Sequence, residues 1–256
     1  MTFNKLILQN KYMNIYNKYK YELDKIKLYT NNDYIFNMFL YYGFNIDNKF
    51  IKLDSNINIY ESGFVSLLIK YYILKYKKKE KLNILEIGLA YGTSSIIIIN
   101  QILQYPFSKS FDILDPYQEK DWNNYGIKHI KQFLGNKKLD YHLYNEDSTI
   151  IMPKLRKKYD IIFIDGSHFE NIVIQDLENS DKKIKINGFI ILDDVKHDGV
   201  KKALLLFFNN NNKYIKIHMN RNENDIIADK IIYDNNSIKK SFINPNTMFC
   251  FQKIRL

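Results

Sequence analysis

The hydrophobic positions of this chain change their period near residue 83. Before it, from about Leu6 to Leu40 and again from Ile57 to Tyr76, apolar residues recur at the spacing of helices. After it, short apolar runs alternate with stretches of helical period. The runs predict strands at about 83–87, 109–114, 140–144, 160–164 and 188–192, and the stretches predict helices near 93–104, 123–134, 148–157, 169–182 and 197–208.

The predicted strands are almost wholly apolar, as in Ile161-Ile162-Phe163-Ile164. Such strands are buried on both faces, and their alternation with helices predicts an α/β fold in which helices cover both sides of a mostly parallel sheet. The tail predicts two more strands, at about 214–219 and 247–253, with a long polar stretch between them. We expect residues 1–56 to form a helical cap or extension and residues 57–256 to form the main domain.

The segment 83–95 carries the most specific local signal. A buried strand ends at Glu86, and a turn bounded by Gly88 and Gly92 opens directly into an apolar helix. Backbone N–H groups at such a helix start point toward a ligand. A dinucleotide fingerprint needs Gly-x-Gly-x-x-Gly, but the middle position here is Ala90, and an acid before the turn repels pyrophosphate. The turn therefore favours a ligand that carries positive charge, S-adenosylmethionine, over NAD.

Acidic residues follow every one of the five predicted parallel strands. In strand order they are Glu86, Asp115, Glu146-Asp147, Asp165 and Asp193-Asp194. Ligands of an open parallel sheet bind beyond the carboxyl ends of its strands. Asp115 is placed to accept from ribose hydroxyls, although an earlier strand end would exchange its role with that of Asp112. Asp147 and Ser148 suit an adenine amine or, equally well, the cap of the next helix.

The last two acidic groups predict a cation site. Asp165, Asp193 and Asp194 would lie on adjacent strands, and like charges so close raise one another's pKa unless a cation or proton joins them. Carboxylate oxygens suit Mg²⁺ or another hard divalent ion. His168 could act as a general base near neutral pH, or it could be a helix-start residue bonded to a neighbouring carboxylate.

Together these motifs resemble those of class I S-adenosylmethionine-dependent methyltransferases. Residues 85–92, Leu-Glu-Ile-Gly-Leu-Ala-Tyr-Gly, are similar to motif I of that family. Residues 159–168 and 188–194 resemble its small-molecule O-methyltransferase branch, which includes the catechol and macrolide-sugar enzymes. The resemblance covers roughly residues 60–208. It implies a Rossmann-like fold whose seven-stranded, mostly parallel sheet has the order 3-2-1-4-5-7-6, with the final strand antiparallel.

The resemblance also implies the roles of particular residues. The expected cofactor contacts are Glu86, Gly88, Ala90, Tyr91, Gly92, Ser94, Asp115, Asp147, Ser148 and Asp165. The implied metal ligands are Asp165, Asp193 and Asp194, and the catalytic candidates are His168 and Asp165. Where the catechol enzymes have a lysine base this chain has His168, and where the sugar enzymes have an acid it has Ser167, so the base assignment stays open.

Composition changes this interpretation little. The net charge is +10, but arginine occurs only at Arg156, Arg221 and Arg255, and the abundance of Lys, Asn, Ile and Tyr is typical of an AT-rich genome. A surface selected for phosphate would use the bidentate arginine fork. Methylation of a small molecule is therefore the favoured function. The two alternatives are a methyltransferase acting on a nucleic acid or a protein, and a cofactor-binding subunit without catalysis.

The remaining expectations concern the environment of the protein. Cys250 is the single cysteine, which excludes an intramolecular disulfide and suits a reducing compartment. With no apolar run long enough to span a bilayer, the sequence predicts a soluble, cytoplasmic protein without a membrane partner. Tyrosines near the N-terminus could line an acceptor pocket, pack against one another or form a homodimer interface; they are Tyr12, Tyr16, Tyr19, Tyr41 and Tyr42.

Overall fold

The computed structural model describes residues 44–46, 49–51, 57, 59–76, 81–209, 211–220, 225–230 and 248–255. Within them an eight-stranded sheet has the order β5-β4-β3-β6-β7-β10-β8-β9. Its strands are β3 (Leu82–Ile87), β4 (Lys109–Leu114), β5 (Asp140–Tyr144), β6 (Tyr159–Ile164), β7 (Ile184–Leu192), β8 (Tyr214–Asn220), β9 (Asp225–Lys230) and β10 (Phe249–Lys253). The helices are α4 (Ile59–Tyr76), α5 (Thr93–Leu103), α6 (Tyr125–Leu134), α7 (Ser148–Lys154), α8 (Glu170–Lys183) and α9 (Asp198–Asn209).

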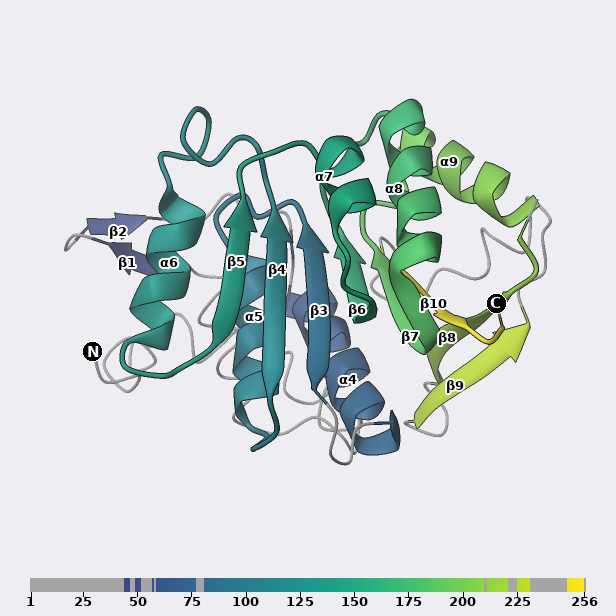
Figure 1. Ribbon diagram of the computed structural model, residues 1–256, viewed down its shortest axis with the longest axis horizontal. Helices are drawn as coiled ribbons and strands as arrows, with labels where there is room; N and C mark the ends of the chain where they lie inside the picture. Colours follow the sequence, from purple (N-terminus) through teal and green to yellow (C-terminus); the bar gives the residue numbers. More distant parts are fainter. Residues whose placement is uncertain are drawn as a thin grey trace.

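The strand order confirms the predicted topology. β5, β4, β3, β6 and β7 are parallel neighbours, and β10 pairs antiparallel with both β7 and β8. In chain order these seven strands give 3-2-1-4-5-7-6, the order that the resemblance implies. The carboxyl ends of β3, β4 and β6 therefore meet at one edge of the sheet, where the sequence places its turn and its acids (Figure 1).

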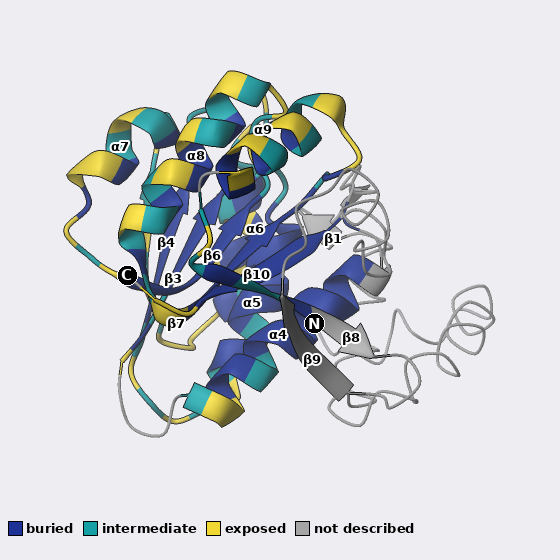
Figure 2. Cartoon of the chain, turned by 90° about the vertical axis from the view of Figure 1, so that its right-hand side faces the viewer, coloured by how far each residue is buried: buried dark blue, intermediate teal, exposed yellow. Residues whose placement is uncertain are grey.

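Two layers of helices enclose the sheet. One apolar cluster joins α4, α5 and α6 to residues such as Ile84, Phe111 and Ile161, and the other joins α7, α8 and α9 to residues such as Leu85 and Ile162. Neighbouring residues of a strand thus face opposite layers, as the pleat requires. Figure 2 shows the buried sheet and the exposed residues on the outer side of α7, α8 and α9, whereas α5 is buried over most of its length. No helix in the described part of the chain is both long enough and apolar enough to cross a membrane.

Two features depart from the sequence prediction. The polar stretch between β8 and β10 contains an eighth strand, β9, which pairs antiparallel with β8 at the edge of the sheet. Its Ile-Ile-Ala core is too short to stand out among charged neighbours. Within the expected helical extension, β1 (Phe44–Ile46) and β2 (Lys49–Ile51) form an antiparallel pair instead. The helices predicted between residues 6 and 40, and the five tyrosines, lie outside the described residues.

Element boundaries differ by a few residues for local reasons. Helix α6 begins two residues late because Asn123 and Asn124 have positive φ angles, 47° and 58°. Helix α7 ends at Lys154, since Leu155 is extended. Strand β7 begins four residues early, and it includes Asn187 at φ 66° beside an irregular register with β6. These local turns leave the carboxyl ends of the strands where the sequence places them.

Candidate functional site

The turn after β3 requires glycine at its first position. Gly88 has φ +91°, and a Cβ added there would lie 2.0 Å from the carbonyl oxygen of Asp165. Ala90 has φ 45°, and Gly92 at φ 79° is the N-cap of α5. The Asp165 N–H donates to the carbonyl of Ile87 at 2.8 Å, so the end of β6 lies directly against the turn. The turn and the acid after β6 therefore form one continuous surface.

Glu86 is buried and faces the start of α5. Its Oε1 accepts from the Ser94 hydroxyl at 2.5 Å, and its Oε2 accepts from the Ser95 hydroxyl. Burial raises the pKa of Glu86 to about 8; the two serine hydrogen bonds oppose the rise and the charge of Asp115 adds to it. The sequence predicts a negative charge at Glu86. With a pKa of about 8, its carboxyl group is instead largely protonated at pH 7.

Asp115 holds the turn against the loop that follows β4. Its Oδ2 accepts from the N–H groups of Leu89 (3.0 Å) and Ala90 (2.9 Å) and from the Gln118 amide (2.9 Å), and its Oδ1 accepts from the Tyr117 N–H (2.8 Å). A carboxylate has about four lone-pair sites. A ribose hydroxyl would therefore have to replace one of these donors, and the ribose contact of Asp115 stays a prediction.

Asp112 has a different place. It lies within β4, fully buried, and its carboxylate accepts from Lys157 Nζ (2.7 and 2.9 Å) and from the Tyr159 hydroxyl (2.7 Å). Because β4 continues to Leu114, the strand-end acid is Asp115. Asp112 is a buried partner of a lysine in the layer beneath α7 and α8.

The loop after β4, whose residues 115–118 and 122–126 also resemble the family's second-strand region, supplies further contacts to the turn. The Gln118 amide also donates to the Ala90 carbonyl at 2.9 Å, and a Cβ on Gly126 would lie 2.5 Å from that same oxygen. In the described part of the chain, two buried atoms near this turn have no hydrogen-bond partner: Gln118 Oε1 and Thr93 Oγ1. Orphaned buried acceptors and hydroxyls fit a polar ligand at the turn. The rings of Tyr91 and Trp122 lie in the same region, with centroids 5.1 Å apart and planes at 67°.

Asp147 and Ser148 begin α7. Asp147 is the N-cap, and its Oδ1 accepts from the Thr149 N–H at 2.8 Å and from the Thr149 hydroxyl at 2.6 Å. Of the two interpretations left open by the sequence, the helix cap is thus present, and the adenine contact stays a prediction.

A further acid, Asp176 in α8, is buried, and burial raises its pKa to about 7. The resemblance to the O-methyltransferase branch includes Asp176-Leu177, but it implies no role for Asp176.

The three predicted metal ligands follow adjacent strands. The Asp193 N–H donates to the Ile164 carbonyl at 2.9 Å, next to the Asp165 contact with β3, and Asp193 Oδ1 accepts from the Asp194 N–H at 2.7 Å. Burial raises the pKa of Asp165 well above its ordinary value, and the charges of Asp193 and Asp194 raise it further. Glu86 and Glu61, an acid of α4 that the motifs do not reveal, add to this effect. A cation bound beside Asp165 would oppose this rise in its pKa.

Two histidines surround Asp194 instead. His168 Nε2 lies 2.8 Å from Asp194 Oδ2, and His197 Nε2 lies 3.9 Å from Asp194 Oδ1. Among the described residues, these three form the group whose candidate ligand atoms all lie within 4.8 Å of one another. The predicted set of Asp165, Asp193 and Asp194 does not form such a group within that part of the chain. Of the two roles left open for His168, the contact with a neighbouring carboxylate is present.

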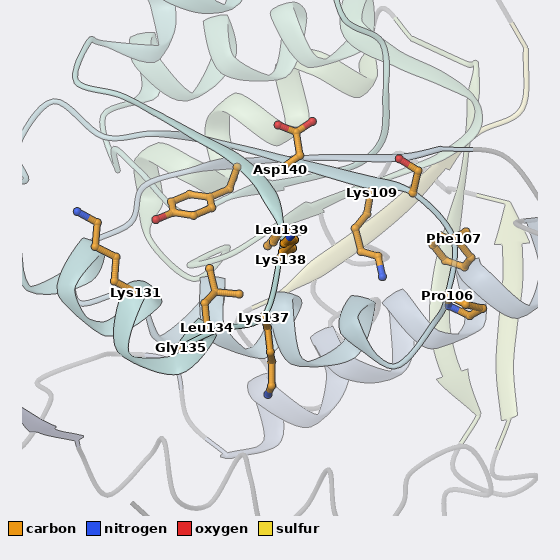
Figure 3. A pocket seen from close by; sticks show the side chains of 12 residues that line it. Pro106, Phe107, Lys109, Lys131, Leu134, Gly135, Lys137, Lys138, Leu139 and Asp140 are labelled. Atoms are coloured by element: carbon orange, nitrogen blue, oxygen red, sulfur yellow. The ribbon is translucent and has the colours of Figure 1, made fainter.

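A basic groove lies at the other end of the sheet. It has a volume of about 720 Å³ and is lined by residues from the ends of β4 and β5 and of α6, among them Lys109, Lys131, Lys137 and Lys138 (Figure 3). These are the amino ends of the strands, whereas the turn and the acids lie at the carboxyl ends. The groove is therefore separate from the candidate site.

The segment that carries the candidate site matches a known domain. Residues 85–195, which include the turn and the acids up to Asp194, match the family model described as a methyltransferase domain. The fold is similar to that of the O-methyltransferase TomG from Streptomyces achromogenes, which is involved in tomaymycin synthesis and was solved in complex with S-adenosylmethionine. The identity is 11%, the match covers 94% of this chain and 98% of that one, and the TM-score is 0.54.

Two further solved structures share the fold. The O-methyltransferase NovP is 12% identical, with 92% of this chain and 99% of that chain covered and a TM-score of 0.55. The O-methyltransferase from Bacillus cereus, in complex with S-adenosylhomocysteine, is 14% identical, with 93% and 97% covered and a TM-score of 0.51. A search of curated proteins finds no match. Residues 85–195 thus match a methyltransferase domain, and the chain shares the fold of these solved O-methyltransferases.

Proposed function

We propose that the protein transfers a methyl group from S-adenosylmethionine to a hydroxyl oxygen of a small molecule. The observation that carries the proposal is the turn after β3, where Gly88 lets the end of β6 approach and where Asp115 fixes the backbone. This turn lies within the segment that matches a methyltransferase domain. The names of TomG, NovP and the Bacillus cereus protein support oxygen as the acceptor atom.

The residues of the turn would bind and orient the cofactor. Gly88, Ala90 and Gly92 leave the backbone free of bulky side chains, and the orphaned Thr93 Oγ1 and Gln118 Oε1 offer polar partners near it. When bound, S-adenosylmethionine supplies an electrophilic methyl group. Most of the acceleration would come from holding the acceptor oxygen in line with that group at near-attack distance.

His168 is the candidate that would take the hydroxyl proton. Its Nε2 lies 2.8 Å from Asp194 Oδ2, and a hydrogen bond from Nε2–H to this carboxylate leaves Nδ1 as the basic nitrogen. The side chain of His168 is 41% exposed, so a hydroxyl substrate can reach it. Asp194 would then fix the tautomer and stabilise the imidazolium that forms.

We include in the proposal that a hard divalent ion such as Mg²⁺ assists the transfer. Asp165, Asp193 and Asp194 would have to turn toward one another to hold it, because their oxygens do not form a common group in this structure, although carboxylate oxygens are the ligands that Mg²⁺ prefers. It would lower the pKa of an acceptor hydroxyl. Burial and the neighbouring acids raise the pKa of Asp165, and a bound divalent ion would lower it again.

The second candidate is methylation of a nucleic acid, which the net charge of +10 suggests. The basic groove does not favour methylation of a nucleic acid at this site, because the groove lies at the opposite end of the strands.

Three further expectations stay predictions: a small-molecule partner, a homodimeric state and a cytoplasmic location.

Calorimetric titration with S-adenosylhomocysteine tests the proposal first. We expect saturable micromolar binding that EDTA does not change, and we expect Asp115→Ala to weaken it while Lys137→Ala in the basic groove does not. An acceptor panel of phenols, catechols and sugars, run with and without Mg²⁺, then tests the transfer. Absence of cofactor binding would remove the proposal, and turnover on RNA or DNA alone would favour the second candidate.

A further inference from the structure

Three residues from two loops converge on one point beside the candidate site. His168 follows β6, Asp194 follows β7, and His197 immediately precedes α9. Each oxygen of the Asp194 carboxylate faces a different imidazole: Oδ2 faces His168 Nε2 at 2.8 Å, and Oδ1 faces His197 Nε2 at 3.9 Å. The two rings stack with centroids 4.3 Å apart. One carboxylate between two imidazoles offers nitrogen and oxygen donors to a common ion.

The backbone builds this arrangement. Asp194 has a positive φ of 53°, and the His197 N–H donates to the Asp194 carbonyl at 2.8 Å, which closes a turn that brings the two side chains together. Gly199, in the first turn of α9, allows the start of that helix to approach the loop that carries His168: a Cβ at Gly199 would lie 2.2 Å from the His168 carbonyl oxygen. Both histidines are thus fixed by main-chain geometry, although their rings are exposed.

From this geometry we propose that His168, Asp194 and His197 bind a divalent first-row transition ion, represented by Zn²⁺. Two imidazoles and one carboxylate form the protein ligand set of many zinc and iron(II) centres that keep open positions for water or substrate. Mg²⁺ prefers an all-oxygen shell, so this set discriminates against it. The binding needs neither methyl transfer nor the cofactor, but the ion takes the place of the proton on His168 Nε2, so it replaces the hydrogen bond from Nε2–H to Asp194.

The distances need only small adjustments. Ligand atoms at about 2.0–2.1 Å from a tetrahedral zinc lie about 3.4 Å from one another. The observed separations of 2.8 and 3.9 Å stand on either side of that value. The ring planes are 19° apart, so one imidazole must turn about its χ2 bond to direct its nitrogen at the shared ion. That torsion is broad for histidine, and side-chain exposures of 41% and 55% leave both rings room to turn.

This site differs from the predicted carboxylate site in a testable way. Both would use Asp194, but only the transition-ion site needs His197, and only the carboxylate site needs Asp165. A substitution of His197 therefore separates the two. His142 offers a matched control, because it is also exposed and its Nδ1 also lies near two carboxylates, 3.7 Å from Asp112 and 3.8 Å from Asp140.

The experiment is a metal titration of the full chain, with any purification tag removed and after dialysis against a chelator. Zn²⁺ binding is measured by calorimetry, and Co²⁺ binding is measured by its visible absorption. We expect saturable binding of one ion per chain, weakened at least about tenfold in His168→Asn and His197→Asn and unchanged in His142→Asn and Asp165→Asn. Circular dichroism checks that each variant is folded.

Three results would overturn the proposal. Zn²⁺ binding that is unsaturable, or that His142→Asn weakens as much as His197→Asn does, would mean adsorption to surface histidines. Full-strength binding in His197→Asn would remove that residue from the site. Binding that Asp165→Asn abolishes and Mg²⁺ matches would identify the carboxylate site instead. Because no cofactor is present, failure of the proposed methyl transfer leaves this test unaffected.

Discussion

Replacing Gly88 by alanine tests whether the turn after β3 is as tightly built as its geometry indicates. Two costs apply. An L-residue at φ +91° pays about 1–2 kcal/mol for the left-handed backbone. The new methyl would lie 2.0 Å from the carbonyl oxygen of Asp165 and 2.7 Å from its carbon, so the backbone of the β6 end must move, which costs typically 1–3 kcal/mol. The reduced entropy of the unfolded chain returns about 0.4–1 kcal/mol. We expect a net loss of about 1–4 kcal/mol.

Gly135 provides the control. It also has a positive φ, 51°, but nothing lies within 4 Å of a Cβ built there. Gly135→Ala therefore carries the backbone cost without the clash, and we expect it to lose at most about 1–2 kcal/mol. The difference between the two variants isolates the contact between the turn and Asp165.

Urea unfolding followed by circular dichroism measures both losses, and calorimetry measures the affinity for S-adenosylhomocysteine. We expect Gly88→Ala to weaken the cofactor analogue as well, since the end of β6 must shift, and Gly135→Ala to leave its affinity unchanged. Equal destabilisation of the two variants would refute the reasoning about the clash. Unchanged affinity in Gly88→Ala would refute the role of the turn in binding.

Two other predictions concern the carboxylates near this turn. The pKa of Glu86 is about 8 in the folded chain against an ordinary 4.5, so the folded state holds more protons between these values and its stability falls as pH rises through that window. The free energy of unfolding changes by about 1.4 kcal/mol per pH unit for this group. Urea unfolding at pH 5.5 and pH 7.5 should show a flatter pH dependence of stability in Glu86→Gln than in the exposed control Glu119→Gln. Equal pH dependence in the two variants would contradict the raised pKa of Glu86. Asp115→Ala removes the acceptor of four hydrogen bonds, and we expect a loss of about 2–4 kcal/mol in urea unfolding; a loss below about 0.5 kcal/mol would mean that Asp115 serves ligand binding alone.

The sequence predicted the sheet well because its signals were local and strong. β4 and β5 begin and end where the apolar runs do, and the order of seven strands followed from the family resemblance. It missed β9 because an edge strand receives its stability from pairing with β8, and pairing partners leave no mark in a single sequence. For residues 1–40 the predictions stay untested.

The site was predicted only in part, for a physical reason. Acids at strand ends can be located from the alternation of elements, and Asp115, Asp165 and Asp193 lie where that argument puts them. The conformation of a loop cannot be located in this way. His197 meets His168 only because Asp194 adopts a positive φ and because Gly199 admits a close backbone approach. Neither cause has a sequence pattern that points to a neighbouring loop.

The acids around Asp165 lead to a prediction about proton release when the cofactor binds. Burial and the carboxyl groups of Asp193, Asp194, Glu86 and Glu61 raise the pKa of Asp165 well above its ordinary value, and burial raises the pKa of Glu86 to about 8. A cationic ligand placed among them would lower both pKa values and release protons. S-adenosylmethionine carries a sulfonium charge that S-adenosylhomocysteine lacks. Calorimetry at pH 7 in two buffers of different ionisation enthalpy should therefore show more protons released for S-adenosylmethionine than for S-adenosylhomocysteine, and fewer from Glu86→Gln than from the natural chain. Equal proton release for the two ligands would mean that the sulfonium lies away from these acids, because a charge that does not approach them cannot change their protonation.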